Sequence, residues 1–269
     1  MTTRKALPGV IVPSRLPSCK DCLSGEELDF DFTMAFQPFV QAGESEVFGY
    51  EALVRGIQGE SAAEILAKVN DTNRYRFDQA CRVRAIKCAS EFDLKGVLSI
   101  NFLPNAIYRP ETCIRATLEA ARKLDFDPHR LMFEVTEGEK VTDHAHLRRI
   151  FAEYKVQGFK TAIDDFGAGY AGLNLLAEFQ PDYIKLDMAL TRNIDTDPVR
   201  RAIVSGIVAT CNALGLGIIA EGVETAAEYT HLRSFGITLF QGYLFARPAF
   251  RALPEVSAEG RALLEGRGP

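Results

Sequence analysis

Residues 131–165 read LMFEVTEGEKVTDHAHLRRIFAEYKVQGFKTAIDD, and this stretch contains the unit that decides the fold. Two short apolar runs, 131–135 and 161–164, are typical of buried strands. Between them, residues 144–157 carry apolar side chains at helical spacing. A strand, a helix and a second strand in this order predict two parallel strands joined by a crossover helix.

The same alternation recurs along the chain. Apolar runs predict strands at 33–40, 47–54, 97–101, 131–135, 161–164, 183–186, 217–220 and 238–240. Helical spacing is found at 62–70, 77–92, 113–124, 144–157, 199–214 and 226–235. About eight strands in about 240 residues favour an α/β fold of the (β/α)8 TIM-like barrel type, with a doubly wound sheet as the alternative. The short polar link QAGESE between the first two strands predicts a hairpin, and hence an antiparallel first strand.

Composition and charge narrow the class of protein. The chain has 269 residues, of which 47% are hydrophobic and 25% charged, as in ordinary soluble globular proteins. A net charge of −5 argues against binding to duplex nucleic acid. The uncharged stretch 202–220 is nearly long enough to span a membrane, but its glycines and Asn212 indicate a turn instead. We therefore expect no membrane partner.

The ends of the chain carry no catalytic pattern. We expect a leader at 1–30, a catalytic domain at 31–255 and a tail at 256–269, with at most a short helix after Pro248. The six cysteines and the lack of a secretory signal favour reduced thiols and a cytoplasmic location. Cys19 and Cys22 form a lone CxxC, for which an irregular arm is the alternative to a metal or redox site.

Polar side chains close most of the predicted strands. They are Glu51, Asn101, Glu134, Asp164, Asp165, Lys185, Asp187, Glu221 and Gln241. Because the carboxyl ends of barrel strands meet at one face, these groups are expected to converge, although each acid alone could be a surface group or a helix cap. Clustered carboxylates need a cation, and oxygen ligands suit Mg²⁺ or Mn²⁺ better than zinc. Asp164–Asp165 could bridge two ions, the arrangement used for phosphoester displacement, and the spacing of two would place Lys185 and Asp187 on one face.

Ordered motifs extend this pattern into a family resemblance. They are FQPF (36–39), YEALVRG (50–56), INFLP (100–104), FEVTE (133–137), DDFGAGY (164–170), IKLD (184–187), AEGVET (220–225) and QGYLFARP (241–248). Together they resemble EAL domains, the cyclic di-GMP phosphodiesterases, over roughly residues 33–250. The resemblance implies a (β/α)8-like barrel with an antiparallel first strand. It also implies hydrolysis of cyclic di-GMP to linear pGpG by in-line attack of a metal-bound water.

The resemblance assigns roles by position. Glu51, Asn101, Glu134 and Asp164 would hold a first Mg²⁺ or Mn²⁺ ion, and Asp164, Asp165 and Glu221 would approach a second. The implied catalytic residues are Lys185 on the attacking water or phosphate, Glu221 and Asp187 as candidate proton acceptors, and Glu137 bracing the 164–170 loop. The implied substrate-binding residues are Gln37, Arg55 and Pro248 along the dinucleotide groove, with Glu224 and Gln241 supporting the site.

Three residues depart from the family pattern. Leu103, Ala168 and Ala171 replace hydroxyl residues of the frequent pattern, which affects loop rigidity rather than metal ligands.

The alternative functions are a non-catalytic cyclic di-GMP receptor acting through a protein partner, and a pure interaction module. The family implies a homodimer, for which helix 202–213 is one candidate surface and core packing is the alternative. The form AGLNLL resembles EAL domains found with blue-light sensors, which would require a regulatory protein in trans.

Overall fold

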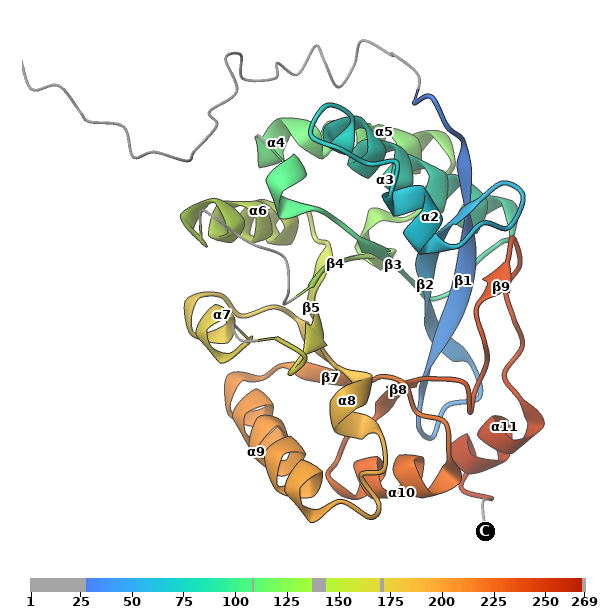
Figure 1. Cartoon of the computed structure of the whole chain (residues 1–269), viewed down its shortest axis with the longest axis vertical. Coiled ribbons are helices and arrows are strands. Elements are labelled where there is room, and N and C mark those ends of the chain that lie inside the picture. The colour runs from blue at the N-terminus through green and yellow to red at the C-terminus, as the bar shows by residue number, and fades with distance from the viewer. Residues whose placement is uncertain (1–27, 108, 137–143, 170–171, 268–269) are drawn as a thin grey trace, which may run out of the picture.

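The computed structural model describes residues 28–107, 109–136, 144–169 and 172–267 (Figure 1). Residues 1–27 of the predicted leader, with Cys19 and Cys22, lie outside these residues, as does Glu137. The strands are β1 Phe32–Gln41, β2 Val47–Gly56, β3 Val97–Asn101, β4 Leu131–Thr136, β5 Lys160–Phe166, β6 Tyr183–Leu186, β7 Gly217–Ala220, β8 Leu239–Gln241 and β9 Ala249–Phe250.

These strands close into a barrel. Strands β2 to β8 pair in sequence order as parallel neighbours, and β1 closes the ring by pairing with both β2 and β8. Both pairings of β1 are antiparallel, with Gln37 opposite Glu51 and Phe39 opposite Gln241. The predicted barrel and its antiparallel first strand are therefore confirmed. Strand β1 runs opposite to the others, so its first half contributes to the face where the other strands end.

Helices surround the barrel, as Figure 1 shows. They are α2 Ala62–Leu66, α3 Arg74–Glu91, α4 Pro110–Cys113, α5 Arg115–Lys123, α6 His144–Val156, α7 Gly172–Glu178, α8 Met188–Thr191, α9 Pro198–Leu214, α10 Ala226–Ser234 and α11 Ala258–Leu264. The predicted helix 62–70 ends early, at Leu66, where the amides of Lys68 and Val69 donate to carbonyls three residues earlier and tighten the last turn. The predicted helix 113–124 corresponds to α5, and the short helix α4 before it, which ends at Cys113, was not predicted.

Three short elements in the second half of the chain were not predicted: the helices α7 and α8, and the strand β9 after Pro248. Helices α7 and α8 have seven and four residues, too few for a clear periodic pattern. Strand β9 has two residues and pairs with β1 at Ala35 and Phe36. The sequence predicted at most a short helix after Pro248. Helix α11 agrees with this prediction, whereas strand β9 was missed.

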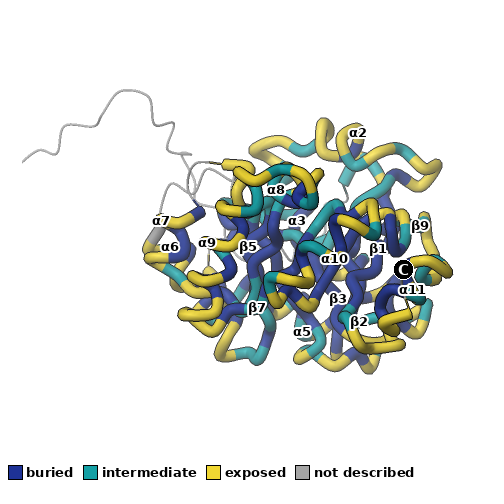
Figure 2. Tube along the Cα trace, turned by 90° about the horizontal axis from the view of Figure 1, so that it is seen from below, coloured by how far each residue is buried: buried dark blue, intermediate teal, exposed yellow. Residues whose placement is uncertain are grey.

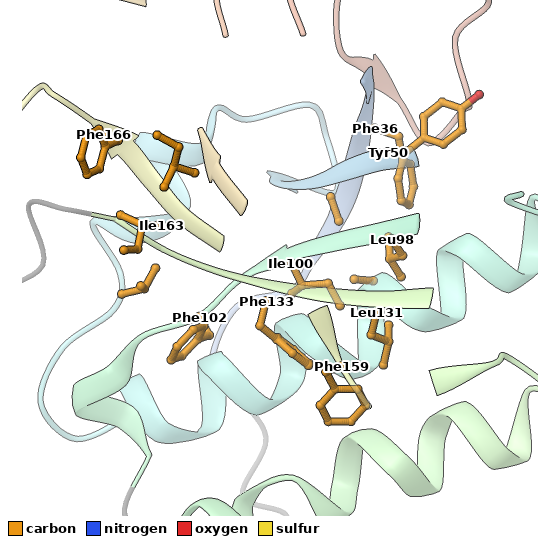
Figure 3. Close-up of a cluster of buried hydrophobic side chains, with 14 of the residues drawn as sticks. Phe36, Tyr50, Leu98, Ile100, Phe102, Leu131, Phe133, Phe159, Ile163 and Phe166 are labelled. Carbon is orange, nitrogen blue, oxygen red and sulfur yellow. The ribbon is translucent and has the colours of Figure 1, made fainter. Parts of the chain in front are cut away.

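The apolar side chains form two layers. The larger one lies between strands and helices, and Figure 3 shows part of it, including Leu98, Phe133 and Phe159. A smaller cluster draws one buried residue from each of six strands: Phe39, Val97, Met132, Ala162, Ile219 and Leu239. Because it joins strands all around the ring, this cluster fills the barrel interior near the strand beginnings. Figure 2 shows the resulting contrast between a buried barrel and exposed outer helix surfaces.

Helix α9 is amphipathic rather than membrane-spanning. Val204, Val208 and Cys211 are buried against the core, whereas Val199 and Ile203 are exposed. The helix ends at Gly215 in the left-handed region, and β7 follows at once. None of the helices in the described part of the chain has the length and apolarity needed to cross a bilayer.

A buried ion pair joins α3 to α6. Arg82 is fully buried and lies 2.7 Å from Asp78, one helical turn earlier. Its guanidinium also donates to the Tyr154 hydroxyl at 2.8 Å, and Asp78 accepts the Leu103 amide hydrogen at 2.9 Å. Through Leu103, the pair fixes the backbone two residues after Asn101, the end of β3.

Replacing Arg82 alone is expected to be strongly destabilising. Arg82→Met leaves the Asp78 carboxylate buried without its partner, which costs about 3–5 kcal/mol in comparable pairs. Asp78→Asn/Arg82→Met removes the charge and keeps an acceptor for Leu103, so it should recover part of that loss. Urea unfolding at pH 8 measures both variants. Equal losses in the single and double variants would contradict coupling between the two charges.

Candidate active site

The side chain of Lys185 occupies the centre of the face where the strands end. It comes from β6, is 1% exposed, and places its Nζ within 3.3 Å of four carboxylates. The distances are 3.3 Å to Glu51 on β2, 2.9 Å to Glu134 on β4, 3.0 Å to Asp164 on β5 and 2.8 Å to Glu221 after β7. Residues separated by up to 170 positions (from Glu51 to Glu221) therefore meet at one ammonium group.

One ammonium cannot neutralise four carboxylates, so the pKa values of several of the clustered groups are raised. Burial, reinforced by Glu51 and Asp164, raises the pKa of Glu134 to about 8 despite the nearby Lys185. Burial also raises the pKa of Glu221 well above its usual range. For Lys185, burial favours the neutral amine, but the surrounding carboxylates outweigh it and raise the pKa well above the ordinary value. The site therefore has a strong demand for additional positive charge.

Two amides hold Glu51 in place. Asn101, the last residue of β3, donates to Glu51 Oε1 at 2.9 Å, and Gln241, the last of β8, donates to Oε2 at 2.8 Å. Gln241 also approaches Gln37 Oε1 at 3.3 Å, and Gln37 donates to the Ala246 carbonyl. Because Nδ2 of Asn101 faces Glu51, and no hydrogen bond to its amide oxygen is found among the described residues, that oxygen can act as a ligand.

A bulge in β5 places two consecutive carboxylates at the same face. The pairing of β5 with β6 shifts between Ile163 and Phe166, and Asp165 has a φ of 54°, in the left-handed region. Strict alternation would send Asp164 and Asp165 to opposite faces; the bulge removes that constraint. Burial and the neighbouring Asp164 raise the pKa of Asp165 to about 6. The prediction that the strand end brings both carboxylates to the mouth of the barrel is thus confirmed in geometry.

The carboxylates form two groups with metal-ligand spacing that share Asp164. One contains Glu51, Glu134 and Asp164, the other Asp164, Asp165 and Glu221, and in each the ligand atoms lie within 4.8 Å of one another. Glu134 Oε1 is buried without a hydrogen-bond partner in the described residues, as expected of an atom that completes its coordination with an ion. A donor set of carboxylate oxygens fits Mg²⁺ or Mn²⁺.

A cleft opens beside these carboxylates. Predicted residues that line it are Gln37, Glu51, Asp165, Asp187, Glu221, Glu224 and Gln241. Met188 and Tyr243 line it as well and were not predicted. Tyr243 is 46% exposed, and the Arg247 guanidinium lies over its ring at 4.0 Å. Tyr243 and Arg247 both belong to the motif QGYLFARP. An aromatic and a cationic residue shortly after Gln241 were the sequence signal that could have identified these two residues.

Three of the predicted residues, Asp187, Glu224 and Arg55, interact with protein groups outside the carboxylate cluster. Asp187 caps α8 by accepting the Ala189 amide hydrogen at 2.8 Å. Glu224 pairs with Arg192 at 2.7 Å. Arg55 donates to the carbonyl of Val54 and, like Pro248, is absent from the described lining of the cleft.

A family model of the EAL domain matches residues 27–248. The chain belongs to the EAL domain family. It is 31% identical to the blue light- and temperature-regulated antirepressor BluF of Escherichia coli K12 and 29% identical to the cyclic di-GMP phosphodiesterase RocR of Pseudomonas aeruginosa. These matches cover 83% and 91% of this chain but only 56% and 64% of the relatives.

Solved EAL structures share the fold. A standalone versatile EAL protein from Vibrio cholerae O395, in its c-di-GMP bound form, is 55% identical with a TM-score of 0.84. The match covers 87% of this chain and 98% of that one. BlrP1 of Klebsiella pneumoniae, in a manganese and cyclic di-GMP complex, is 38% identical with a TM-score of 0.79, covering 84% of this chain and 58% of that one.

The raised pKa of Glu134 predicts a pH-dependent stability in the metal-free protein. Its pKa of about 8 in the folded state exceeds the ordinary value of 4.5, so the folded state binds the extra proton between these values. In EDTA the wild type should therefore lose stability relative to Glu134→Gln as the pH rises from 5 to 8. Thermal unfolding of both variants checks this, with the exposed-site variant Glu119→Gln as control.

Saturating Mn²⁺ should remove this loss, because bound ions favour the ionised carboxylates. Parallel pH profiles of the wild type and Glu134→Gln in EDTA would contradict the prediction.

Proposed function

We propose that this chain is a metal-dependent phosphodiesterase that hydrolyses cyclic di-GMP to linear pGpG. The observation that carries the proposal is the sharing of Asp164 between two carboxylate groups around Lys185, at the edge of a cleft. Similarity to RocR, named a cyclic di-GMP phosphodiesterase, and to EAL structures with bound cyclic di-GMP supports the substrate.

The residues that would hold the ions follow from the two groups. Glu51, Asn101, Glu134 and Asp164 would ligate one Mg²⁺ or Mn²⁺, and Asp164 with Asp165 and Glu221 a second. Bound ions would neutralise phosphoryl oxygens and lower the pKa of a water molecule. The similar BlrP1 structure with manganese supports a divalent ion at this face.

The chain's own residues then hold and move protons. The Lys185 ammonium, with its raised pKa, stays charged and would donate to the attacking water or to a phosphoryl oxygen. Glu221 touches Lys185 at 2.8 Å and lines the cleft, so its carboxylate would accept the proton of the water. Asp187, also on the cleft wall, is the second candidate acceptor. Attack on phosphorus would break the bond to the 3′ oxygen, which leaves as a hydroxyl after taking up a proton, because pGpG keeps its phosphate on the 5′ side.

The cleft wall supplies the contacts to the dinucleotide. Gln37 and Gln241 lie next to Glu51 and would orient the phosphate beside the carboxylates. Glu224 supports the wall through Arg192. Arg55 and Pro248 extend the predicted groove, where the guanidinium of Arg55 would turn from the Val54 carbonyl to a phosphate.

Removal of a predicted metal ligand, or of Lys185, should greatly reduce hydrolysis. Glu51→Ala and Lys185→Met are expected to lower turnover of cyclic di-GMP about a hundredfold or more, because each removes several kcal/mol of charge stabilisation. Glu119→Gln, on the exposed side of α5, should match the wild type. Chromatography of the nucleotides after incubation with Mg²⁺ or Mn²⁺, with an EDTA control, measures pGpG directly.

Metal-independent turnover, or full activity in Glu51→Ala, would refute the proposed site. Tight binding of cyclic di-GMP without turnover in either metal would replace the enzyme with a receptor that acts through a protein partner.

A homodimer through the outer face of α9 remains a prediction. Val199 and Ile203 are 65% and 46% exposed on this face, and their burial would stabilise an association of two copies. Sedimentation should give a dimer for the wild type and a monomer for Val199→Glu/Ile203→Glu. A wild-type monomer at assay concentration would contradict control through this surface.

A further inference from the structure

Glu228, which no predicted role includes, makes an unusual set of contacts behind the cleft. It lies in the first turn of α10 and is 2% exposed. Its Oε1 accepts the Asn193 amide hydrogen at 2.9 Å, and its Oε2 accepts those of Glu224 at 2.9 Å and Thr225 at 3.1 Å. One buried carboxylate thus receives three backbone hydrogen bonds.

A helix cap accounts for only part of this arrangement. In the capping box of α10, Thr225 Oγ1 accepts the Glu228 amide hydrogen, and Glu228 accepts that of Thr225 in return. The bonds to Glu224 and Asn193 are additional to this box. Asn193 lies 35 residues earlier, at a left-handed turn with a φ of 54°, in the loop that follows β6 and α8.

The segment 191–193 touches the carboxylate-bearing loop after β7 at three points. The Thr191 hydroxyl donates to the Glu221 carbonyl at 2.5 Å. Arg192 pairs with Glu224 at 2.7 Å and approaches Glu228 at 3.9 Å. The third contact is the bond from Asn193 to Glu228. The loop that carries Glu221 is therefore fixed from behind by the loop that follows β6, and Glu228 links both.

We infer that Glu228 is a positioning residue for the second carboxylate group, Asp164, Asp165 and Glu221. This inference rests on the proposed function. By holding Glu224 and Thr225 against Asn193, Glu228 sets the place of Glu221 relative to Asp164 and Asp165. The other group depends on Glu51 and Glu134, whose strands have no hydrogen bond to Glu228 in the described residues, so it should not respond.

The test is Mn²⁺ binding to the whole chain, measured by calorimetry without substrate. Glu228→Gln keeps the size of the side chain but turns an NH₂ group toward at least one of the three backbone donors. We expect it to weaken the second equivalent of Mn²⁺ about 10–100-fold and to leave the first unchanged. Glu134→Gln is the reference, because it should weaken the other equivalent.

Thr225→Ala is the matched control for a merely structural effect. It removes the hydroxyl from the same capping box and keeps the contacts of Glu228 with Asn193 and Glu224. It should lower the melting temperature but retain both equivalents. Thr191→Val removes the bond to the Glu221 carbonyl together with a 3.4 Å contact to the Met188 carbonyl within α8. It should weaken the second equivalent in the same direction, and it replaces Glu228→Gln if that variant does not fold.

Unchanged binding of both equivalents in Glu228→Gln and Thr191→Val would overturn the inference. Equal weakening in Thr225→Ala would also overturn it, because the cap alone would then explain the effect. Failure of the proposed function has a different signature, namely no turnover of cyclic di-GMP by the wild type with either ion.

Discussion

The contact of one lysine with four carboxylates is the interaction on which the active face depends. The four acids are far apart in the sequence, at positions 51, 134, 164 and 221, so no short segment of the chain forms this cluster by itself. Here the acids come from β2, β4, β5 and the end of β7, and they meet only when the barrel closes. Closure of the barrel and assembly of the site are therefore the same event.

Burial of apolar side chains elsewhere in the barrel offsets the repulsion between these carboxylates. The apolar cluster at the strand beginnings and the layer between strands and helices stabilise the ring that forces the acids together. Polar partners then limit the freedom of each acid: amides on Glu51, a bulge under Asp164 and Asp165, and the loop behind Glu221. The site is thus positioned by strand ends, with a left-handed residue, Asp165, where β5 departs from regular pairing.

Much of this was predictable from the sequence, for a physical reason. Long apolar runs with crossover helices can pair in few ways, so eight strands, the hairpin and the convergence of strand-end acids followed from spacing and topology. Strand β9 and helix α8 were missed because their few residues are held by long-range bonds and a cap, which leave no periodic pattern. The alternation argument does not apply to Asp187, since β6 ends at Leu186 and Asp187 caps α8, yet its side chain lines the cleft beside the carboxylates. Contacts such as Asn193 with Glu228 depend on loop geometry, which spacing does not encode.

The reversed direction of β1 has a consequence for how this barrel can be joined to other polypeptides. Phe32, at the start of β1, lies opposite Gly56 at the end of β2, so the chain enters on the side of the carboxylates. The last helix, α11, packs near Gly43 in the β1–β2 hairpin, so the chain leaves on the opposite side (Figure 1). A domain joined before Leu28 would therefore attach at the carboxylate end of the barrel, and a domain joined after α11 would attach at the hairpin end.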